Sequence, residues 1–361
     1  MGTSMPPSGG SGRPPSGTLS IRPPSGSFAA RPPTQSLVGR RLKGRYRIEE
    51  LLGRGASSAV YAATDEESGQ PVVLKVAIGA SDGHCRRWEH EAAVLRSLEH
   101  PCLPRLLDDG ALDDRTPFLV LVRLRGETLA ARLERDRVLP SALVCRLLHR
   151  AARALSAAHL RGVVHRDLKP SNLFVCGPPE APTDLCVLDF GLSKSVTPLV
   201  DSSSHLTDLG MTVGTAEYMT PEQALTDPVD GRTDIYALGV VLFRALTGHL
   251  PFAGGDKMAL LAHHVATAPP PLPPPHAPSL AALVARTLRK RPEHRYPSMD
   301  ALADDLLALS DASAPIVPPP PGSHDIYAPR SAFGAQVVRS YYELLDRPVP
   351  DPLLGLADEE D

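Results

Sequence analysis

The chain carries the stretch His165-Arg166-Asp167-Leu168-Lys169-Pro170-Ser171-Asn172 between an expected helix and an expected strand. Asp167 can accept or orient a hydroxyl proton, and Lys169 can neutralise charge on a moving phosphoryl group. Asn172 offers a neutral oxygen to a divalent metal ion. This stretch therefore predicts a loop that handles phosphate.

A second motif, Asp189-Phe190-Gly191, follows at the end of another expected strand and supplies a charged metal ligand. Phosphoryl transfer depends on positioning and on cations that face the developing charge, more than on covalent help. The two motifs in this order favour that chemistry over a purely structural loop.

Lys75 is one of six lysines in the chain and lies in the apolar stretch 72–76. A lysine inside an apolar strand is costly unless it is paired. It could reach water from an edge strand, or a carboxylate on the following helix could hold it toward phosphate oxygens. Glu91 supplies such a carboxylate and Glu89 competes with it, but the spacing to His100-Pro101 favours Glu91.

A glycine-containing segment, Leu52-Gly53-Arg54-Gly55-Ala56-Ser57-Ser58-Ala59-Val60, lies between two expected strands. Glycines let backbone N–H groups approach phosphates that side chains would keep away. Ser58 stands where the usual third glycine would be, and no Lys-Ser or Lys-Thr closes the segment as in a P-loop. On its own this segment could equally be a hairpin turn.

Composition indicates a globular protein. The chain has 361 residues, of which 42% are hydrophobic and 22% charged, and its net charge of -3 gives no reason to expect nucleic-acid binding. The N-terminus lacks an apolar core of signal-peptide length, and the longest apolar run, Ile235 to Leu246, is interrupted by Arg244 and too short to span a bilayer, so no transmembrane helix is expected. The five cysteines form no CxxC pair, so we expect reduced thiols in a cytoplasmic protein. Several histidines lack zinc spacing and are expected at the surface, namely His84, His90, His263 and His264.

The two ends of the chain differ from its middle. Residues 1–40 are rich in Pro, Ser, Gly and Arg, and we expect a disordered tail that is either a flexible spacer or a docking or autophosphorylation segment. Residues 311–361 are expected to form a Pro-rich, acidic tail.

Between the tails, the patterns predict a small β-rich lobe over about residues 46–124 and a mainly helical lobe over about 125–310. Strands are expected at 47–52, 60–63, 72–76 and 118–121, with one helix at 86–98. Helices are then expected at 141–160, 221–225, 233–246, 258–267, 279–288 and 299–309, with short strands near Leu173 and Val187.

Over about residues 46–309, these motifs resemble those of the bacterial Hanks-type (eukaryotic-like) Ser/Thr protein kinases. The resemblance implies a catalytic domain over residues 41–310 with an α+β, two-lobed fold. It implies a five-stranded antiparallel N-lobe with one regulatory helix, above a mainly helical C-lobe, with ATP in the cleft between them. It also implies Mg²⁺ as the metal and protein Ser or Thr hydroxyls as acceptors.

The resemblance assigns roles to the residues that match the family's motifs. The catalytic group would be Asp167, Lys169, Lys75, Glu91 and Thr215, and the Mg²⁺ ligands would be Asn172 and Asp189. ATP would be bound by Leu52, Gly53, Arg54, Gly55, Ala56, Ser57, Ser58, Val60, Val73, Lys75, Leu121, Leu124 and Phe174. Among these, Val60, Val73 and Phe174 would enclose the adenine. Leu121 would be the gatekeeper, at the start of a hinge over residues 122–124.

Further positions match the family or depart from it. Thr220-Pro221-Glu222 stands where the family has Ala-Pro-Glu, with Arg295 placed to pair the glutamate and Asp234 placed to brace the catalytic loop. Val73 replaces the usual alanine and narrows the roof over the adenine, and Val122 replaces a frequent hinge glutamate. The Pro-rich insert 177–183 is expected to be a surface loop.

The acceptor and its regulation follow from the same comparison. Lys169 and Thr215, which would hydrogen-bond near Asp167, favour Ser and Thr of a polypeptide as acceptors. Arg166 stands where the family contacts a phosphate on the activation segment, so autophosphorylation is expected. The candidates are Ser202, Ser203, Ser204, Thr207 and Thr212, with Thr207 and Thr212 ranked first because they lie nearest Thr215.

The alternative is a pseudokinase, a scaffold that recruits partners through its Pro-rich tails. Its usual signature is the loss of Lys75, Asp167 or Asp189, and all three are present. The expected partners are therefore ATP and protein substrates, with docking partners of the tails as a further possibility. Any activating input is expected through a cytoplasmic partner.

Overall fold

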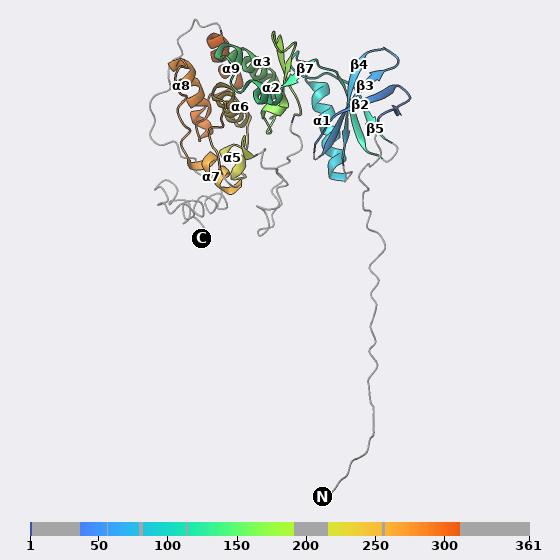
Figure 1. The fold of residues 1–361 in the computed structure, drawn as a ribbon, viewed down its shortest axis with the longest axis horizontal. Coiled ribbons are helices and arrows are strands. Elements are labelled where there is room, and N and C mark those ends of the chain that lie inside the picture. Colours follow the sequence, from blue (N-terminus) through green and yellow to red (C-terminus); the bar gives the residue numbers. More distant parts are fainter. Residues whose placement is uncertain are drawn as a thin grey trace.

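The computed structural model describes Met1 and residues 37–55, 57–78, 82–112, 115–190, 216–254 and 257–310. Figure 1 shows a β-rich lobe with one helix beside a larger helical lobe. This is the α+β, two-lobed arrangement that the sequence predicted. Both tails, residues 2–36 and 311–361, lie outside the described part of the chain.

The strands of the first lobe form an antiparallel sheet. They are β1 Arg41–Leu42, β2 Tyr46–Arg54, β3 Ser58–Asp65, β4 Pro71–Ala77, β5 Leu106–Ala111 and β6 Pro117–Val122. Within the described residues the sheet has six strands in the order β1-β2-β3-β4-β6-β5, where the resemblance implied five. The additional strand is β1, which pairs with β2 at the edge of the sheet. With two residues, β1 is too short to show the alternating pattern by which a strand is predicted from sequence.

Helix α1, Asp82–Ser97, covers one face of this sheet. Side chains alternate along a strand, so Leu74 and Val76 of β4 point into the core on the other face. Lys75 lies between them in sequence and opposite Leu119 in register, and Leu119 packs against α1. The alternation therefore turns the one lysine of β4 toward the helix.

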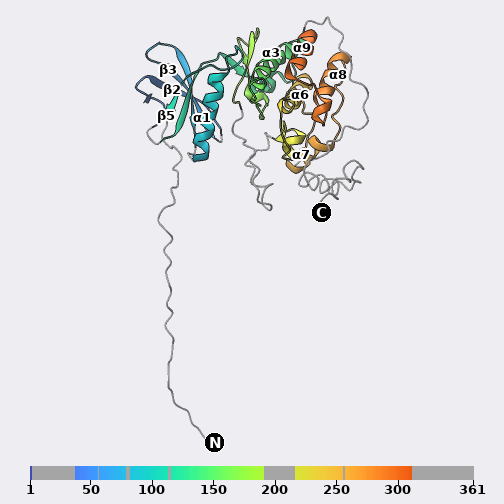
Figure 2. The same cartoon turned by 180° about the vertical axis from the view of Figure 1, so that it is seen from behind.

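The second lobe is built from helices around a buried centre. They are α2 Leu129–Asp136, α3 Ser141–His159, α5 Pro221–Ala224, α6 Gly231–Thr247, α7 Lys257–Ala266, α8 Pro278–Thr287 and α9 Met299–Ser310. Helix α6 is buried along most of its length and packs against α3, α8 and α9, as Figure 2 shows from behind. The helices expected after residue 140 begin and end close to the residues predicted for them.

A second, smaller sheet connects the lobes. It contains β7 Gly126–Thr128, β8 Leu173–Cys176 and β9 Asp184–Val187, paired in that order. The sequence patterns located neither β7 nor α2. Gly126 is required here because its φ is +146° and an added Cβ would lie 2.0 Å from the Val175 carbonyl oxygen. The insert 177–183 forms a turn between β8 and β9 with its prolines at the surface, as expected.

Two expectations about the surface and the membrane can be compared with this fold. His264 is fully buried on α7, which corrects the expectation of a surface residue, because this face of α7 packs toward Tyr236 of α6. Among the helices that the structure describes, none is both long and apolar enough to cross a membrane.

Candidate active site

Lys75 joins the two lobes through ion pairs. Its Nζ atom lies 2.5 Å from Glu91 Oε1 on α1 and 2.7 Å from Asp189 Oδ1 beyond β9. Burial alone would lower the pKa of Lys75, but the carboxylates of Asp189 and Glu91 outweigh burial and raise it. Lys75 therefore remains a cation although it is only 8% exposed, which the expected phosphate-binding role would require.

The register of α1 explains why Glu91 holds the lysine and Glu89 does not. Residues three apart lie on one face of a helix, and Trp88 and Glu91 both face Lys75. The Nζ atom is 5.3 Å from the centre of the Trp88 ring, which adds a cation–π contact. Glu89 lies on the neighbouring face and is exposed.

The expected catalytic loop holds Asp167, Lys169 and Asn172 together. Lys169 donates from Nζ to Asp167 Oδ2 at 2.9 Å, and Asn172 donates from Nδ2 to the Asp167 carbonyl at 2.8 Å. Because the amide nitrogen of Asn172 faces Asp167, its amide oxygen is the atom turned to other ligands. Leu188 donates its N–H to the Asn172 carbonyl at 2.8 Å, which ties the loop to the strand that leads to Asp189.

The carboxylate of Asp234 holds this loop against α6. Asp234 of α6 is fully buried and accepts the backbone N–H groups of His165 and Arg166 at 2.8 and 2.9 Å. His159 donates to the same carboxylate at 2.7 Å. Burial favours the neutral acid, but these hydrogen bonds and the charge of nearby histidines outweigh it and lower the pKa of Asp234. The ionised carboxylate also supports the left-handed backbone of Arg166, whose φ is +65°.

His165 and Phe190 connect the loop to the motif that is expected to bind metal. The His165 ring is fully buried, donates from Nε2 to the Leu188 carbonyl at 2.9 Å, and lies 5.1 Å from the Phe190 ring. Asp189 has a φ of +50°, and its side chain is 53% exposed. Burial alone would raise the pKa of Asp189, but the charge and hydrogen bond of Lys75 outweigh burial and lower it. An ionised carboxylate is thus presented to the cleft.

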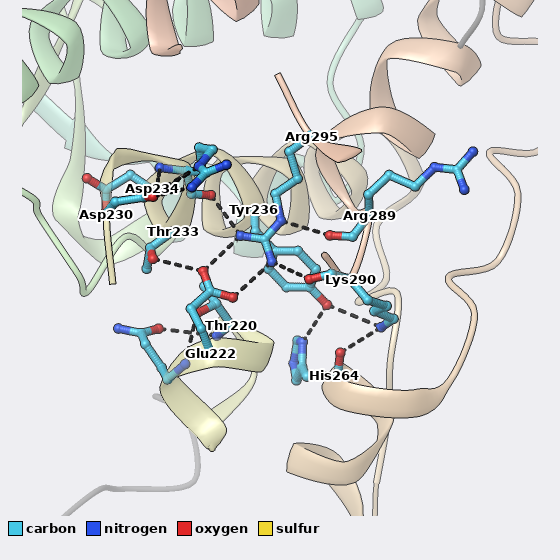
Figure 3. A network of polar contacts seen from close by, with 12 residues as sticks. Thr220, Glu222, Asp230, Thr233, Asp234, Tyr236, His264, Arg289, Lys290 and Arg295 are labelled. Carbon is cyan, nitrogen blue, oxygen red and sulfur yellow. Dashed lines mark hydrogen bonds and ion pairs between the residues drawn. The ribbon is translucent and has the colours of Figure 1, made fainter. Parts of the chain in front are cut away.

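A buried ion pair fixes the residues that follow the expected activation segment (Figure 3). Arg295 donates from Nη1 and Nη2 to the two Glu222 oxygens at 2.8 and 2.9 Å, and Thr233 donates to the same carboxylate. The pair that the resemblance implied is therefore present. Sequence reasoning missed Gln223, which completes a capping box with Thr220 and donates to the Arg166 carbonyl at 2.7 Å.

Apolar side chains line the cleft where the adenine was expected. Val73 lies opposite Leu121 in register, and Val60 lies opposite Lys75 on the next strand. The apolar side chains expected around the adenine are all partly exposed, whereas their neighbours on the strands are mostly buried; they are Val60, Val73, Leu121, Leu124 and Phe174. A flat aromatic ligand between the lobes would cover them.

The glycine-containing segment forms the expected hairpin between β2 and β3. Gly55 donates its N–H to the Ser58 carbonyl at 2.8 Å, and Gly53 pairs with Val60. Leu52 at its start is 46% exposed, and Arg54 and Ser57 are exposed beyond it. The hairpin therefore presents backbone groups and little bulk to the cleft.

Comparison with known proteins identifies the family. The model of the protein kinase domain matches residues 46–307. The chain belongs to the protein kinase family.

Several bacterial kinases are similar to this chain. The serine/threonine-protein kinase PknA of Mycobacterium tuberculosis is 36% identical over 296 residues, which cover 79% of this chain and 66% of PknA. The serine/threonine-protein kinase pkn3 of Myxococcus xanthus is 35% identical, over 75% of this chain and 51% of the relative. PknB of Mycolicibacterium smegmatis is 31% identical, over 77% and 45%. The chain thus spans less than two thirds of the length of these curated relatives.

The donor set fits the cofactors of the protein kinase family, which are ATP and a divalent metal. Asp189 supplies a charged oxygen and Asn172 a neutral one, which are the ligand types that a hard cation prefers. Lys75 and Lys169 supply positive charge for phosphate oxygens. Some expected site residues lie outside the described part of the chain, namely Ala56, Gly191, Thr215, Ser202, Ser203, Ser204, Thr207 and Thr212.

Proposed function

We propose that the chain is an ATP-dependent serine/threonine protein kinase that transfers the γ-phosphate to protein hydroxyls. The observation that carries this proposal is the double contact of Lys75 with Glu91 and Asp189. It brings together the cation that we propose binds phosphate and the carboxylate that we propose binds metal. Asp167 and Lys169 lie on the loop below them.

In this mechanism the side chains position and neutralise charge. Asp167 accepts a hydrogen bond from the acceptor hydroxyl and orients its oxygen toward the γ-phosphate. Lys169, already held against Asp167, faces the charge that develops on the transferred group. Lys75 holds the α- and β-phosphates, and Val60, Val73 and Phe174 enclose the adenine. Mg²⁺, held by Asp189 and Asn172, would neutralise the charge of the β- and γ-phosphates.

The acceptor class is supported by the relatives and by one residue. PknA, pkn3 and PknB are named serine/threonine-protein kinases. Lys169, two residues after Asp167, is the feature that favoured Ser and Thr over Tyr acceptors. We further propose that the enzyme phosphorylates its own activation segment, with Thr207 and Thr212 as the first candidates and Arg166 as their contact.

The setting of the activity is also a proposal. The cysteines Cys102, Cys145, Cys176 and Cys186 are free thiols, which supports a reducing compartment such as the cytoplasm. Docking partners of the Pro-rich tails remain proposed partners. The scaffold alternative requires the loss of a catalytic group, and Lys75, Asp167 and Asp189 are all retained, so no observation favours it.

Transfer of label from [γ-³²P]ATP to a generic protein substrate in the presence of Mg²⁺ tests the proposal. We expect transfer by the wild-type chain and none above background by Lys75→Met or Asp167→Asn. Lys257→Met, on α7 and away from the cleft, is the matched control and should remain active. A wild-type chain as inert as Lys75→Met under varied metal and substrate conditions would favour the scaffold. Equal modification of the activation segment in wild type and Asp167→Asn would exclude autophosphorylation.

A further inference from the structure

Two thiols face each other across the strands β8 and β9. Phe174 pairs with Cys186 in the register of these strands, and Cys176 pairs with Asp184. Because side chains alternate along a strand, Cys176 and Cys186 lie diagonally on the same face. Their Sγ atoms are 3.7 Å apart. A shift of less than about 2 Å would bring them to the disulfide bond length of about 2.05 Å.

The two sulfur atoms differ in access and in surroundings. Cys176 is partly exposed, so a small oxidant can reach it, whereas Cys186 is 3% exposed. The hydrogen bond with Cys186 lowers the pKa of Cys176, and the same contact together with burial raises the pKa of Cys186. The thiolate is the form that reacts with an oxidant, so Cys176 is placed to react first.

A third thiol, Cys102, lies beside the pair and is engaged elsewhere. It donates from Sγ to Asp184 Oδ1 at 3.4 Å, and Arg150 holds the same carboxylate at 2.7 and 2.8 Å. Burial, and then the negative charge of Asp184, raise the pKa of Cys102 to about 12. Cys102 is thus held against Asp184, whereas the Sγ atoms of Cys176 and Cys186 lie against each other, so position selects Cys176 and Cys186 as the reactive pair.

We propose that Cys176 and Cys186 form a redox-sensitive pair that hydrogen peroxide closes into a disulfide. The Cys176 thiolate attacks one peroxide oxygen, the O–O bond breaks, and hydroxide leaves and takes up a proton to become water. The product is a sulfenic acid on Cys176. Cys186 then loses its proton and attacks the sulfenic sulfur, and the sulfenic hydroxyl leaves with that proton as a second water while the S–S bond forms. One peroxide is reduced to two waters while two thiols are oxidised to one disulfide.

The disulfide acts on the nucleotide site, and this consequence rests on the proposed function. Strand β8 follows directly after Asn172, and β9 ends two residues before Asp189. The cross-link therefore joins the two strands that hold the proposed metal ligands. Phe174, proposed to contact the adenine, lies opposite Cys186. A misplacement of about 1 Å near a reacting group can lower a rate by about 100-fold.

Peptide mapping tests the disulfide independently of activity. The full chain is treated with hydrogen peroxide, its remaining thiols are blocked with N-ethylmaleimide under denaturing conditions, and it is cleaved after glutamate. Glu180 lies between the two cysteines, so their peptides stay joined only through the disulfide and separate on reduction. We expect the joined peptides from wild type and from Cys145→Ser, a buried-thiol control on α3, and not from Cys176→Ser. Unlinked peptides, or a link to Cys102, would overturn the proposal.

Binding of a fluorescent ATP analogue measures the consequence. We expect oxidised wild type to bind about tenfold more weakly than reduced wild type, because the cross-link displaces Phe174, which we propose contacts the adenine. Dithiothreitol should restore binding, and Cys176→Ser should bind equally well before and after peroxide. A mapped disulfide with unchanged affinity would overturn the link to the nucleotide site. Loss of nucleotide binding in both redox states would instead contradict the proposed function and leave the mapping result standing.

Discussion

The Nζ atom of Lys75 lies 2.7 Å from the carboxylate of Asp189, although 114 positions separate the two residues in sequence. Lys75 is fixed to the β-rich lobe by β4, and Asp189 follows the small sheet next to the helical lobe. The Lys75–Asp189 contact therefore reports whether the site residues from the two lobes are aligned with each other. It also pairs the cation proposed to bind phosphate with the anion proposed to bind metal.

Replacement of Glu91 tests this arrangement from the side of α1. Glu91→Gln removes one of the two carboxylates that restrain the Lys75 side chain. The Lys75 ammonium is then held less firmly beside Asp189. We expect kcat/KM for ATP to fall by about 100-fold, the scale of a 1 Å misplacement. Glu89→Gln, two residues away and exposed, is the matched control and should stay near wild type. Equal losses in both variants would show that helix charge matters and the Lys75–Glu91 contact does not.

Loss of Arg295 leaves the buried carboxylate of Glu222 without its partner. Although burial favours the neutral acid, the charge and hydrogen bonds of Arg295 lower the pKa of Glu222, so a charge would remain in the core. We expect Arg295→Met to lower the free energy of unfolding by about 3–5 kcal/mol in urea titrations. Arg153→Ala breaks a surface pair with Asp300 and should cost less than about 1 kcal/mol. A small effect at Arg295 would contradict the buried pair.

Asp234 positions the loop without touching substrate. The side-chain amide of an asparagine has only one acceptor oxygen, so it accepts one backbone N–H while its NH₂ group faces the other N–H. Asp234→Asn should therefore disturb the backbone of His165 and Arg166. We expect kcat to fall at least about tenfold, with a smaller change in KM for ATP. Asp230→Asn alters the N-cap of the same helix and should leave kcat unchanged. A fall in thermal stability alone, with normal kcat, would argue against positioning.

The buried His264 makes folding stability depend on pH. Burial, and then the charge of Lys290, lower its pKa from 6.5 to about 3. Between these values the unfolded chain binds a proton that the folded chain does not, so stability falls as pH drops from 6.5 toward 3. From pH 7 to pH 5 this linkage amounts to about 2 kcal/mol.

Thermal unfolding of His264→Asn provides the check. Asparagine can still meet the Tyr236 hydroxyl, which lies 3.0 Å from Nδ1 of the histidine. We expect the variant to lose less stability than wild type between pH 7 and pH 5. His249→Asn, at an exposed site, should keep the wild-type dependence. Parallel pH curves for His264→Asn and wild type would contradict a neutral, buried histidine.

Much of the fold could be predicted from the sequence because the patterns that define its helices and motifs are local. Helix α3 begins where Pro140 and Ser141 predict a start, and α6 follows a long apolar pattern. The catalytic motifs could be located because each combines a fixed spacing with chemistry that a structural loop does not need. The preference for Glu91 over Glu89 came from spacing alone, and the lysine contacts Glu91.

Other features depend on contacts between distant segments, and these left no local pattern. Strand β5 has the sequence Leu-Leu-Asp-Asp-Gly-Ala, whose burial does not alternate. The closeness of Cys176 and Cys186 depends on the β8–β9 register, which the intervening turn sets. The burial of His264 follows from its contacts with Tyr236, Phe252 and Lys290, which come from other parts of the chain, so the residue itself gave no signal.

Asp234 accepts two consecutive backbone N–H groups and so ties the loop of Asp167 to α6, a helix that is buried along most of its length. Lys75 instead belongs to β4 of the β-rich lobe and meets the other lobe through Asp189. We therefore expect a rearrangement of the β-rich lobe to displace Lys75 and to leave Asp167 in place.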